Sequence, residues 1–597
     1  MATTLACAVL SALVAIALGD GHCLTYVDNN INYINRDIIP AKSNVHSAAA
    51  CCSLCVDTKG CTVYSYVASK SLCRFRNSTK GREAARGVTS GYTLSAPPTS
   101  PPSPPAPLAV PTHRQLEFMD LEFTQFMHFG IPTFWNPPED YLYGNNPTYH
   151  DCHTTSIDHS NQTGSYYPCL HPDVFNPTDL NAEDWMEASA SLGMTEIIIT
   201  AHHEGGFALW PSNYTPYSVA ASKWRNGKGD VLREFTDAAN KWGIKISYYL
   251  NVQDDGYMVS VAKYSPEEFI RRQIGMIKEV LTEYGPVNRF WFDGTKSVPT
   301  GTNVTDLWVQ VYDTIRTVSP NTMISSYRGD VCASKDGNTL YTNNGPAPNS
   351  TDPAGCQDPQ EGGQYFHPTE MHGITIQEGP DGNTDSMPTY WFWHPWACAF
   401  NITGCPWIGH ANASRIFDSY IVTVGRGAVL NMNIPPERTG RMNASVKAVM
   451  AEAGKAINDT FRNSVVQVDT VSGACTDGVV ELTVPAGGQF DYIMSMEDLT
   501  HGQRFGNYSV DFQRVGSSKW ETLVSPSNVT SALQDRPDGH DPRDSHIGHK
   551  RIDLPEVPTS GPVAVQIAKV RLNCLRAIAE PVYVRSFSLH KKTVPWE

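Results

Sequence analysis

The chain has 597 residues, too many for a single hydrophobic core, so two to four domains are predicted. Hydrophobic residues make up 41 % of it, which is the share of a folded globular protein rather than of a disordered one. The formal net charge is −15 at pH 7 and no run of basic residues occurs, which argues against nucleic acid as a partner.

The N-terminus reads MATTLACAVLSALVAIALGDGHC. Residues 5–18 form one apolar block, and Ala17-Leu18-Gly19 ends it with the small-x-small pattern of a cleavage site. We interpret residues 1–19 as a signal peptide, although no Lys or Arg precedes the block. A membrane anchor is the alternative, but the block is short for a span. No other segment approaches 18 consecutive apolar residues, so no membrane span is expected after signal removal.

Cysteine and sequon patterns favour an oxidising compartment. Apart from Cys7 there are fourteen cysteines, six of them between Cys23 and Cys73. The other eight fall as local pairs, which we predict to be disulfides: Cys152–Cys169, Cys332–Cys356, Cys398–Cys405 and Cys475–Cys574. Eleven N-x-S/T sequons occur, at Asn77, Asn161, Asn213, Asn303, Asn349, Asn401, Asn412, Asn443, Asn458, Asn507 and Asn528. These features predict a glycoprotein that is secreted or enters the lumen of the secretory–lysosomal pathway.

A proline-rich segment, residues 95–112, is predicted to be a semi-rigid linker. Before it, residues 20–94 form a module too small to rely on a large core. Its pattern AAACCSLCVDTKGCTVYSYVASKSLCRF resembles the PAN/apple family, whose small disulfide-rich α+β fold binds proteins or carbohydrates. The resemblance implies such a ligand here, and a disulfide-rich spacer without a ligand is the alternative. The pairing of its six cysteines stays open.

From residue 113 to 455 apolar strands alternate with amphipathic helices. TEIIIT (195–200) and IKISYYLN (244–251) are typical of strands, and GDVLREFTDAANKWG between them carries one apolar helical face. SPEEFIRRQIGMIKEVLTEYG begins with Ser265 as a cap and Pro266 in the first turn. The strand RFWFDG, a helix through DLWVQVYDTIRTV and the strand TMISS follow. Repeated βα units of this length predict a (β/α)8 TIM-like barrel as the catalytic domain.

Helical periodicity fades from about residue 456 onward. GVVELTVP, FDYIMSM, NYSVDFQRV, VAVQIAKVRLN and VYVRSFSLHKK have the composition of strands. We therefore predict a C-terminal β-sandwich over residues 456–597, tied by Cys475–Cys574.

Three clusters of chemically active residues follow predicted barrel strands. The first contains His128, the second His202, His203, Glu204 and Trp210, and the third Trp291 and Asp293. In a barrel the C-terminal strand ends line the active site. Aromatic faces pack on a sugar, imidazoles bond its hydroxyls, and a carboxylate can attack its anomeric carbon. Because an aspartate after an apolar strand is costly unless it is used, we assign Asp293 a catalytic role.

A metal site at His202-His203-Glu204 is one alternative. Adjacent strand residues point to opposite faces, and zinc hydrolases favour helical i, i+4 pairs, so no metal and no cofactor is predicted. Histidines buried for structural reasons are the other alternative.

Five segments in chain order carry a resemblance to a known family. They are FMHFG, GMTEIIITAHHEGGFALWPSNYTPYSV, WRNGKGDVLREFTDAANKWGIKISYYLN, YGPVNRFWFDG and YIVTVGRGAVLNMNIPPERTG. They resemble the α-L-fucosidases of glycoside hydrolase family 29, and FDYIMSMEDLTHGQRFGNYSVDF is similar to the β-sandwich of that family. The resemblance implies a retaining mechanism with Asp293 as the nucleophile. It also implies that His128, His202, His203 and Tyr249 hold the fucose hydroxyls, and that Trp291 packs near the sugar.

The sequence departs from the family pattern at several positions. It reads HHEGGF where the family usually reads HHDGF, and the family's Glu-Trp pair is replaced by Glu139 in FWNPPEDYLYG, a fucose-binding candidate. The GNE motif that carries the acid/base in one branch is absent. In the other branch a glutamate precedes an aromatic segment, which makes Glu378 the first acid/base candidate, Glu370 the second and Asp336 the third. An enzyme that lacks this group, slow or inactive, is the alternative.

The sequence thus predicts an exo-acting, metal-independent, retaining α-L-fucosidase that acts on fucosylated glycans or polysaccharides. A glycosidase for a related sugar such as α-L-galactose, which differs only in the C6 substituent, is an enzymatic alternative. A catalytically lapsed glycan-binding protein is the alternative from another class, motivated by the PAN-like module and the missing GNE motif.

Overall fold

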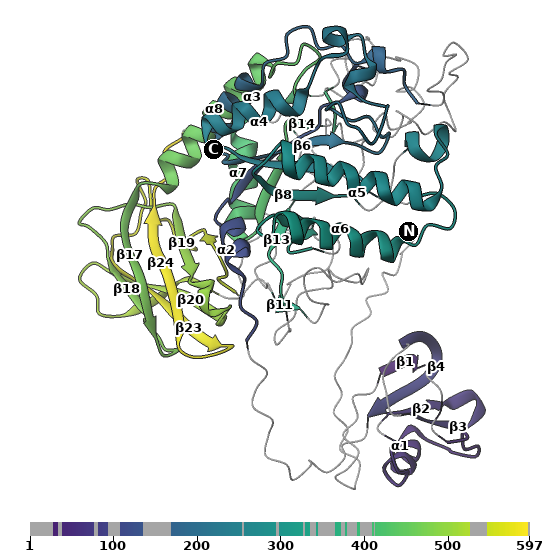
Figure 1. Cartoon of the computed structure of the whole chain (residues 1–597). Helices are drawn as coiled ribbons and strands as arrows, with labels where there is room; N and C mark the ends of the chain where they lie inside the picture. The colour runs from purple at the N-terminus through teal and green to yellow at the C-terminus, as the bar shows by residue number, and fades with distance from the viewer. Residues whose placement is uncertain are drawn as a thin grey trace, which may run out of the picture. The chain divides into compact units, whose positions relative to one another are not determined.

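The structure is a computed structural model of the whole chain (Figure 1). It describes residues 28–33, 37, 39–61, 63–76, 82–92, 108–134, 169–252, 256–293, 298–325, 329–334, 342–343, 365–371, 376–378, 391–393, 409–410, 412–525 and 546–594. The chain divides into two compact units, Met1–Pro105 and Ala106–Glu597. The predicted signal peptide and the predicted pairs Cys332–Cys356 and Cys398–Cys405 lie outside the described side chains.

The first unit is a four-stranded antiparallel sheet with one helix packed on it. Its strands, in the order β1-β4-β2-β3, are β1 (Asp28–Tyr33), β4 (Arg82–Tyr92), β2 (Val63–Val67) and β3 (Leu72–Arg76). The helix α1 (Ala48–Val56) is capped by Ser47 and joined to the sheet by the disulfide Cys51–Cys73, while Cys55–Cys61 closes its end. This agrees with the predicted disulfide-rich α+β module. Its assignment to the PAN/apple family stays a prediction.

The second unit is built on eight parallel strands. In sheet order they are β10 (Cys332–Ser334), β13 (Thr369–Met371), β16 (Val429–Asn433), β5 (Phe123–Met127), β6 (Glu196–His202), β7 (Lys245–Leu250), β8 (Val287–Phe292) and β9 (Met323–Ser325). A parallel bridge between Ser325 and Val331 joins the two ends of this order. The sheet is consistent with the predicted TIM-like catalytic domain.

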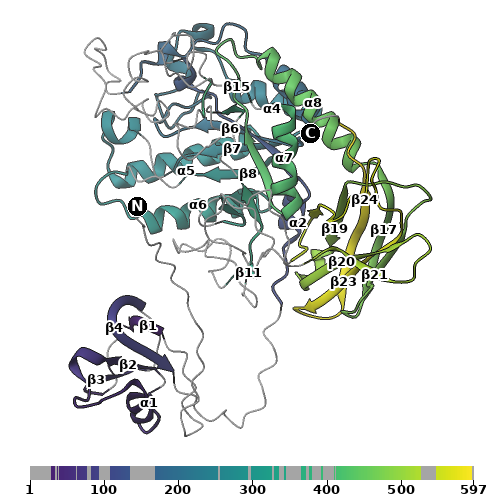
Figure 2. The same ribbon diagram turned by 180° about the vertical axis from the view of Figure 1, so that it is seen from behind.

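Helices follow six of these strands. They are α3 (Ala182–Leu192) after β5, α4 (Val231–Trp242) after β6, α5 (Pro266–Glu283) after β7, α6 (Val304–Val318) after β8, α7 (Ala413–Thr423) after β13 and α8 (Ala444–Phe461) after β16. Figures 1 and 2 show α5 and α6 side by side outside β8. The predicted start of α5 is confirmed, since the Ser265 hydroxyl accepts from the Glu268 N–H. Gly243 ends α4 with a φ of 67°, a conformation that glycine adopts without strain.

Short elements complete the barrel. Before β5 lies α2 (His113–Met119), and the single-turn helices are η2 (Ile131–Phe134), η5 (Pro172–Val174), η6 (Val219–Ala221), η7 (Trp224–Gly227), η8 (Tyr257–Val261) and η9 (Val424–Arg426). Two-residue ladders pair β11 (Thr342–Asn343) with β12 (Tyr365–Phe366) and β14 (Gln377–Glu378) with β15 (Gly409–His410). In the part of the chain that the structure describes, no helix follows β9 or β10.

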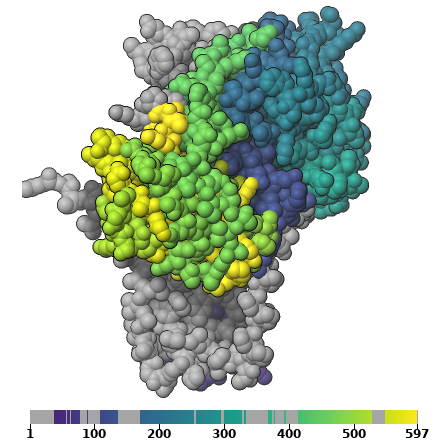
Figure 3. Space-filling model, turned by 90° about the vertical axis from the view of Figure 1, so that its left-hand side faces the viewer, coloured from purple at the N-terminus to yellow at the C-terminus, as the bar shows by residue number. Residues whose placement is uncertain are grey.

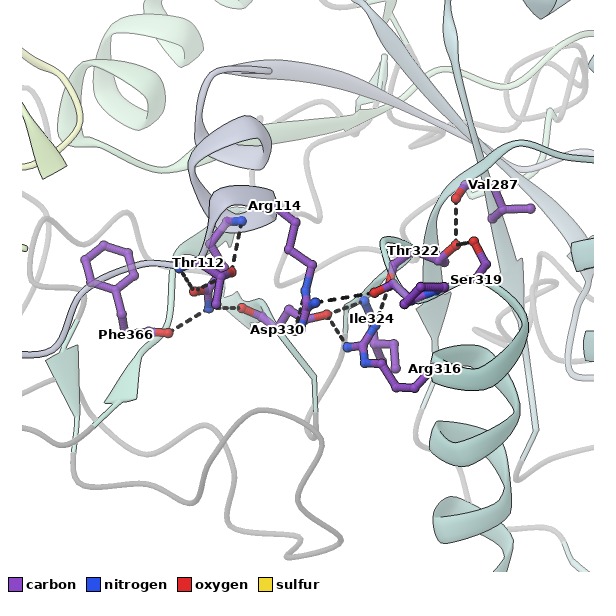
Figure 4. Close-up of polar contacts among 11 residues, drawn as sticks. Thr112, Arg114, Val287, Arg316, Ser319, Thr322, Ile324, Asp330 and Phe366 are labelled. Atoms are coloured by element: carbon purple, nitrogen blue, oxygen red, sulfur yellow. Dashed lines mark hydrogen bonds and ion pairs between the residues drawn. The ribbon is translucent and has the colours of Figure 1, made fainter. Parts of the chain in front are cut away.

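Asp330 holds the barrel together between β9 and β10 (Figure 4). Its Oδ1 accepts from the guanidinium of Arg114 at 3.1 and 2.8 Å, and its Oδ2 accepts from Arg316 at 2.7 Å. Oδ2 also accepts from the Ile324 N–H of β9 at 2.9 Å. Gln115 of α2 donates to the backbone oxygen of Asp330. The buried carboxylate of Asp330 therefore links α2, α6 and β9 at the junction between β9 and β10, where the Ser325–Val331 bridge lies.

The C-terminal part is the predicted β-sandwich. One sheet has the order β17 (Ser464–Gly473), β24 (Val582–His590), β19 (Tyr492–Glu497) and β22 (Arg551–Asp553). The other has the order β18 (Val480–Thr483), β23 (Ile567–Ala577), β20 (Phe505–Arg514) and β21 (Trp520–Val524). The turn η10 (Leu499–His501) follows β19. The predicted disulfide Cys475–Cys574 is confirmed and connects the end of β17 to β23.

The sandwich packs directly on the barrel, as Figure 3 shows for the green-to-yellow segments. Buried Lys550 forms an ion pair with Glu122, which also accepts from the Tyr420 hydroxyl at 2.7 Å. Gly425 faces Ile552 so closely that a Cβ there would lie 2.9 Å from the Ile552 Cβ. Among the described residues, no helix is long and apolar enough to cross a membrane.

Candidate active site

Asp293 follows β8 at the C-terminal edge of the parallel sheet, where the sequence predicts it. The hydroxyl of Tyr249, on neighbouring β7, donates to its Oδ2 at 3.0 Å. Burial, and then the charges of Asp293 and Glu204, raise the pKa of Tyr249 well above its usual value. The hydroxyl therefore keeps its proton and remains a donor to the carboxylate.

An aromatic layer lies directly beneath Asp293. The indole of Trp291 stacks on the Tyr249 ring, with centroids 5.5 Å apart and an interplanar angle of 15°. Phe126 of β5 contacts the same indole at 5.1 Å, and Ile198 completes the buried cluster. Because alternate strand residues share a face, Arg289, Trp291 and Asp293 all point from β8 into the barrel. The four side chains Phe126, Ile198, Tyr249 and Trp291 are called the aromatic floor of the site, and the Asp293 carboxylate lies above them.

His128 lies beside this floor in a fixed orientation. Its Nδ1 lies 2.8 Å from Asn433 Oδ1, and the Asn433 amide nitrogen donates to the Trp391 carbonyl at 2.8 Å. Since Oδ1 can only accept, Nδ1 carries the proton and Nε2 is the acceptor. Burial lowers the pKa of His128 to about 3, against the opposing effect of the Asn433 bond. The imidazole is therefore neutral in mildly acidic and neutral solution.

His203 belongs to the same group of contacting rings. Its ring stacks on Tyr249 at 5.3 Å and meets His128 edge-on at 5.7 Å and Phe392 at 5.0 Å. Burial, and then the neighbouring His128 and His202, lower its pKa well below the usual value. His202 is itself fully buried at the end of β6, where its carbonyl accepts from the Asn251 N–H.

These groups suit a sugar ring. A carboxylate with a fixed donor can attack a carbon centre, neutral imidazoles can bond hydroxyls, and the aromatic rings can pack on C–H surfaces. Within the described residues, no three His, Cys, Asp or Glu side chains are arranged to hold a metal ion.

Trp210 does not lie among these residues. Its indole N–H donates to Glu279 Oε2 on α5 at 3.1 Å, and the ring is almost wholly buried in the main core. The chain turns away from the strand end after β6, so Trp210 packs beside α5 on the outside of the barrel. A role in sugar binding is therefore not supported for this residue.

Glu370, the second acid/base candidate, lies inside the barrel on β13. Its Oε1 accepts from the Trp291 indole at 2.7 Å and from the Asn431 amide at 3.2 Å, and its other oxygen pairs with Arg289. The side chain is fully buried and all three of these partners are N–H donors. A general acid needs a proton and access to the leaving group, so this environment disfavours that role.

The other acid/base candidates are only partly described. Asp336 lies outside the described residues, as does the fucose-binding candidate Glu139, and for Glu378 only the backbone in β14 is described. Two residues earlier, the Ile376 N–H donates to the Asn433 carbonyl at 2.9 Å. The segment that carries Glu378 is therefore anchored at the end of β16, next to the residue that orients His128.

The site also contains residues that the sequence did not single out. Asn433 orients His128, while Trp391 and Phe392 line its ring at 5.0 and 5.4 Å. Glu204, which the sequence placed beside His202 and His203, is almost fully buried, and its charge helps to raise the pKa of Tyr249. The position of Asn433 could have identified it from the sequence, because it lies at the end of a barrel strand and Asp293 directly follows another.

Comparison with known proteins shows the family of the chain. A model of the family described as Alpha-L-fucosidase matches residues 110–460. Alpha-L-fucosidase 1 of Arabidopsis thaliana is 28 % identical over 470 residues, which are 72 % of this chain and 82 % of that protein. Putative alpha-L-fucosidase 1 of Oryza sativa subsp. japonica is 28 % identical over 480 residues, which are 74 % of this chain and 81 % of that protein.

Solved structures support the fold. A putative alpha-L-fucosidase from Bacteroides thetaiotaomicron has a TM-score of 0.59 at 24 % identity and covers 82 % of this chain and 99 % of its own. Because the family model spans more than half of the chain, the chain belongs to the α-L-fucosidase family and is a glycoside hydrolase.

Proposed function

We propose that this α-L-fucosidase removes terminal α-L-fucosyl residues by double displacement, with Asp293 as the nucleophile. The observation that carries the proposal is the Asp293 carboxylate, held by the Tyr249 hydroxyl at the C-terminal edge of the sheet. In the first step a carboxylate oxygen bonds to the anomeric carbon while the bond to the leaving oxygen breaks. An acid gives that oxygen a proton. In the second step water attacks the fucosyl-enzyme, loses its proton to the same residue, and releases fucose with retained configuration.

Glu378 is the acid/base in this proposal. Its segment is anchored beside His128 through the bond between Ile376 and Asn433. Glu370 is the less suitable choice, because three N–H donors surround its buried carboxylate. A retaining pair requires carboxyl groups about 5–5.5 Å apart, so the proposal places the Glu378 carboxyl at that distance from Asp293.

The sugar ring lies among His128, His203 and Tyr249 in this proposal, with Trp291 beneath it. His128 has an acceptor nitrogen, since Asn433 fixes its tautomer. Comparing aryl α-L-fucosides with aryl α-L-galactosides separates the fucosidase from the related-sugar alternative, because the two sugars differ only at C6.

Azide rescue tests the assignment of the two carboxyl groups. We expect Asp293→Gly to lose activity by about 10⁴-fold or more on an activated aryl fucoside, and azide to restore turnover as β-L-fucosyl azide. Glu378→Ala should instead give α-L-fucosyl azide, because its glycosyl-enzyme still forms and azide replaces water in the second step. Wild-type activity in Asp293→Gly, or α-azide from it, would contradict the assignment.

A further inference from the structure

A buried charge cluster lies one layer below the aromatic floor. Arg289 is fully buried on β8 and has two carboxylate partners, Glu196 of β6 and Glu370 of β13, which are also fully buried. Glu196 accepts from Arg289 Nε at 3.3 Å and from its terminal nitrogen at 2.5 Å. Burial alone would lower the pKa of Arg289, but the two carboxylates outweigh it and raise that pKa. The cluster therefore holds one fixed positive charge between two acceptors.

The need to neutralise the charge of Arg289 does not by itself explain why a second carboxylate, that of Glu370, is buried beside it. Glu196 already supplies one compensating charge and faces two guanidinium nitrogens. The third nitrogen also has the Ser325 hydroxyl at 3.1 Å. A second carboxylate in a dry interior is costly unless its other contacts use it. The second oxygen of Glu370 has such contacts, with the Trp291 indole N–H at 2.7 Å and the Asn431 amide at 3.2 Å.

Two further contacts connect Glu370 to the Asp293 carboxylate. The indole that Glu370 holds is the ring on which Tyr249 stacks, 5.5 Å away and nearly parallel. The hydroxyl of Tyr249 is the donor to Asp293 Oδ2. An indole that is not fixed by its N–H would be free to tilt, and a tilt would move the tyrosine hydroxyl together with the carboxylate that it holds.

We propose that Glu370 is a positioning residue of the fucosidase: clamped by Arg289, it fixes the indole of Trp291 and, through the stacked Tyr249, the orientation of the Asp293 carboxylate. The proposal rests on the proposed role of Asp293 as nucleophile. It assigns Glu370 no proton transfer, which separates it from an acid/base. A misplacement of reacting groups by about 1 Å costs about 10²-fold in rate, so the effect is measurable.

A leaving-group series on Glu370→Gln tests this assignment. Glutamine keeps the size of the side chain but presents an N–H to one of the surrounding N–H donors, so one bond is lost. We expect kcat to fall by about 10²-fold with similar KM, by the same factor for dinitrophenyl, nitrophenyl and unactivated phenyl fucosides. Loss of an acid/base would instead spare kcat/KM for dinitrophenyl fucoside and fucosyl fluoride, whose leaving groups need no proton, and would lower their kcat and KM together because the second step lacks its base.

Glu196→Gln is the matched control. It removes the other buried carboxylate from Arg289, and the further hydrogen bonds of Glu196 go to Ser247 and Asn288. We expect it to lower stability while kcat per folded enzyme, counted by covalent labelling with a 2-fluoro-fucosyl fluoride, stays within about twofold of wild type. An equal loss of kcat per folded enzyme in Glu196→Gln would show that the loss comes from the buried charge cluster as a whole rather than from the bond between Glu370 and Trp291, and would overturn the proposal.

A double-mutant cycle with Trp291→Phe tests the route through the indole. Phenylalanine keeps a ring for Tyr249 but has no N–H, so Trp291→Phe alone should reproduce most of the loss. Adding Glu370→Gln to it should then change kcat little. If Glu370→Gln alone folds poorly, Trp291→Phe alone still tests the route, because wild-type kcat in that variant would overturn the proposal. Additive losses, or wild-type kcat in Glu370→Gln, would overturn the proposal. Azide rescue of Asp293→Gly is independent of both variants, so its failure would identify a fault in the proposed nucleophile instead.

Discussion

At the scale of single residues, Asn433 determines the orientation of the His128 ring and which of its nitrogens can accept a hydrogen bond from a sugar hydroxyl. Its Oδ1 accepts from His128 Nδ1 at 2.8 Å, and burial holds the pKa of the imidazole at about 3. Asn433→Asp would place a negative charge against that nitrogen and raise the pKa of His128 by about 1–3 units. Because only neutral His128 has an acceptor at Nε2, we expect the acidic limb of the pH profile of kcat/KM to move to higher pH.

Asn433→Ala is the control for this change. It removes the bonds to His128 and to the Trp391 carbonyl without adding charge, so activity should fall at all pH values with the acidic limb unmoved. An acidic limb in Asn433→Asp at the wild-type position would contradict the argument that neutral His128 is required.

The same scale shows which site residues a sequence can predict. The placement of Asp293 beside Tyr249, and of His128 beside His203, agrees with the prediction, because parallel strands bring their C-terminal ends together. Trp210 was placed wrongly, since the direction of the chain after β6 depends on tertiary packing. From the sequence Glu370 was an acid/base candidate, because its ion pair with Arg289, which is distant in sequence, could not be predicted.

At the scale of elements, sequence patterns predicted those strands and helices whose burial is one-sided or complete. The helix α4 and the strands β6 and β7 are within two residues of their predicted bounds. The strand β17 was missed, because most of its side chains are half-buried or exposed and give no clear alternation. The closure of β9 to β10 was also not predictable, since it depends on the contacts of Asp330 with residues more than 200 positions earlier.

Asp330 provides the prediction at this scale. Asp330→Asn keeps an acceptor for the Ile324 N–H but loses the charge that pairs with Arg114 and Arg316. We expect the free energy of unfolding of the barrel to fall by about 3 kcal/mol, because two guanidinium groups lose a buried partner. Urea unfolding followed by tryptophan fluorescence measures this.

A surface ion pair is the control for Asp330. Lys455 pairs with Asp459 on α8 with its side chain 76 % exposed, so Lys455→Ala should change stability by less than about 0.5 kcal/mol. Equal midpoints for Asp330→Asn and wild type would show that the Ser325–Val331 junction does not depend on this carboxylate.

At the scale of the whole molecule, barrel and sandwich share one feature, buried neutral histidines. Burial is the first cause in each case, and it lowers the pKa of His128 to about 3 and that of His367, His549 and His590 to about 4. The unfolded chain takes up these protons near pH 6.5 and the folded chain does not. Stability is therefore present above about pH 6.5 and is lost as pH falls toward 4, by up to about 1.36 kcal/mol per unit for each group.

One buried carboxyl has the opposite dependence. Burial raises the pKa of Glu497 to about 8, although three backbone N–H groups bond its carboxyl. Its contribution to stability is complete below the unfolded value of about 4.5 and is lost as pH rises through 8. The four histidines outweigh the one glutamate below about pH 6.5, and only the glutamate acts above it, so the two effects together place the maximum of stability near pH 6.5.

His590→Gln tests the histidine part of this argument. His590 connects the sandwich to the end of the barrel, since its Nδ1 lies 3.0 Å from the Thr460 carbonyl of α8, and glutamine retains an N–H for that oxygen. We expect the melting temperature of His590→Gln to fall less steeply between pH 6.5 and 4, because unfolding then takes up as much as one proton fewer. The control His113→Gln, at a histidine whose side chain is 87 % exposed, should leave the slope unchanged. Because His590 keeps its lowered pKa only while it is buried, an unchanged acid slope in His590→Gln would mean that the sandwich separates from the barrel before the barrel unfolds. The acid sensitivity would then belong to the interface of Lys550 and Glu122 rather than to the cores.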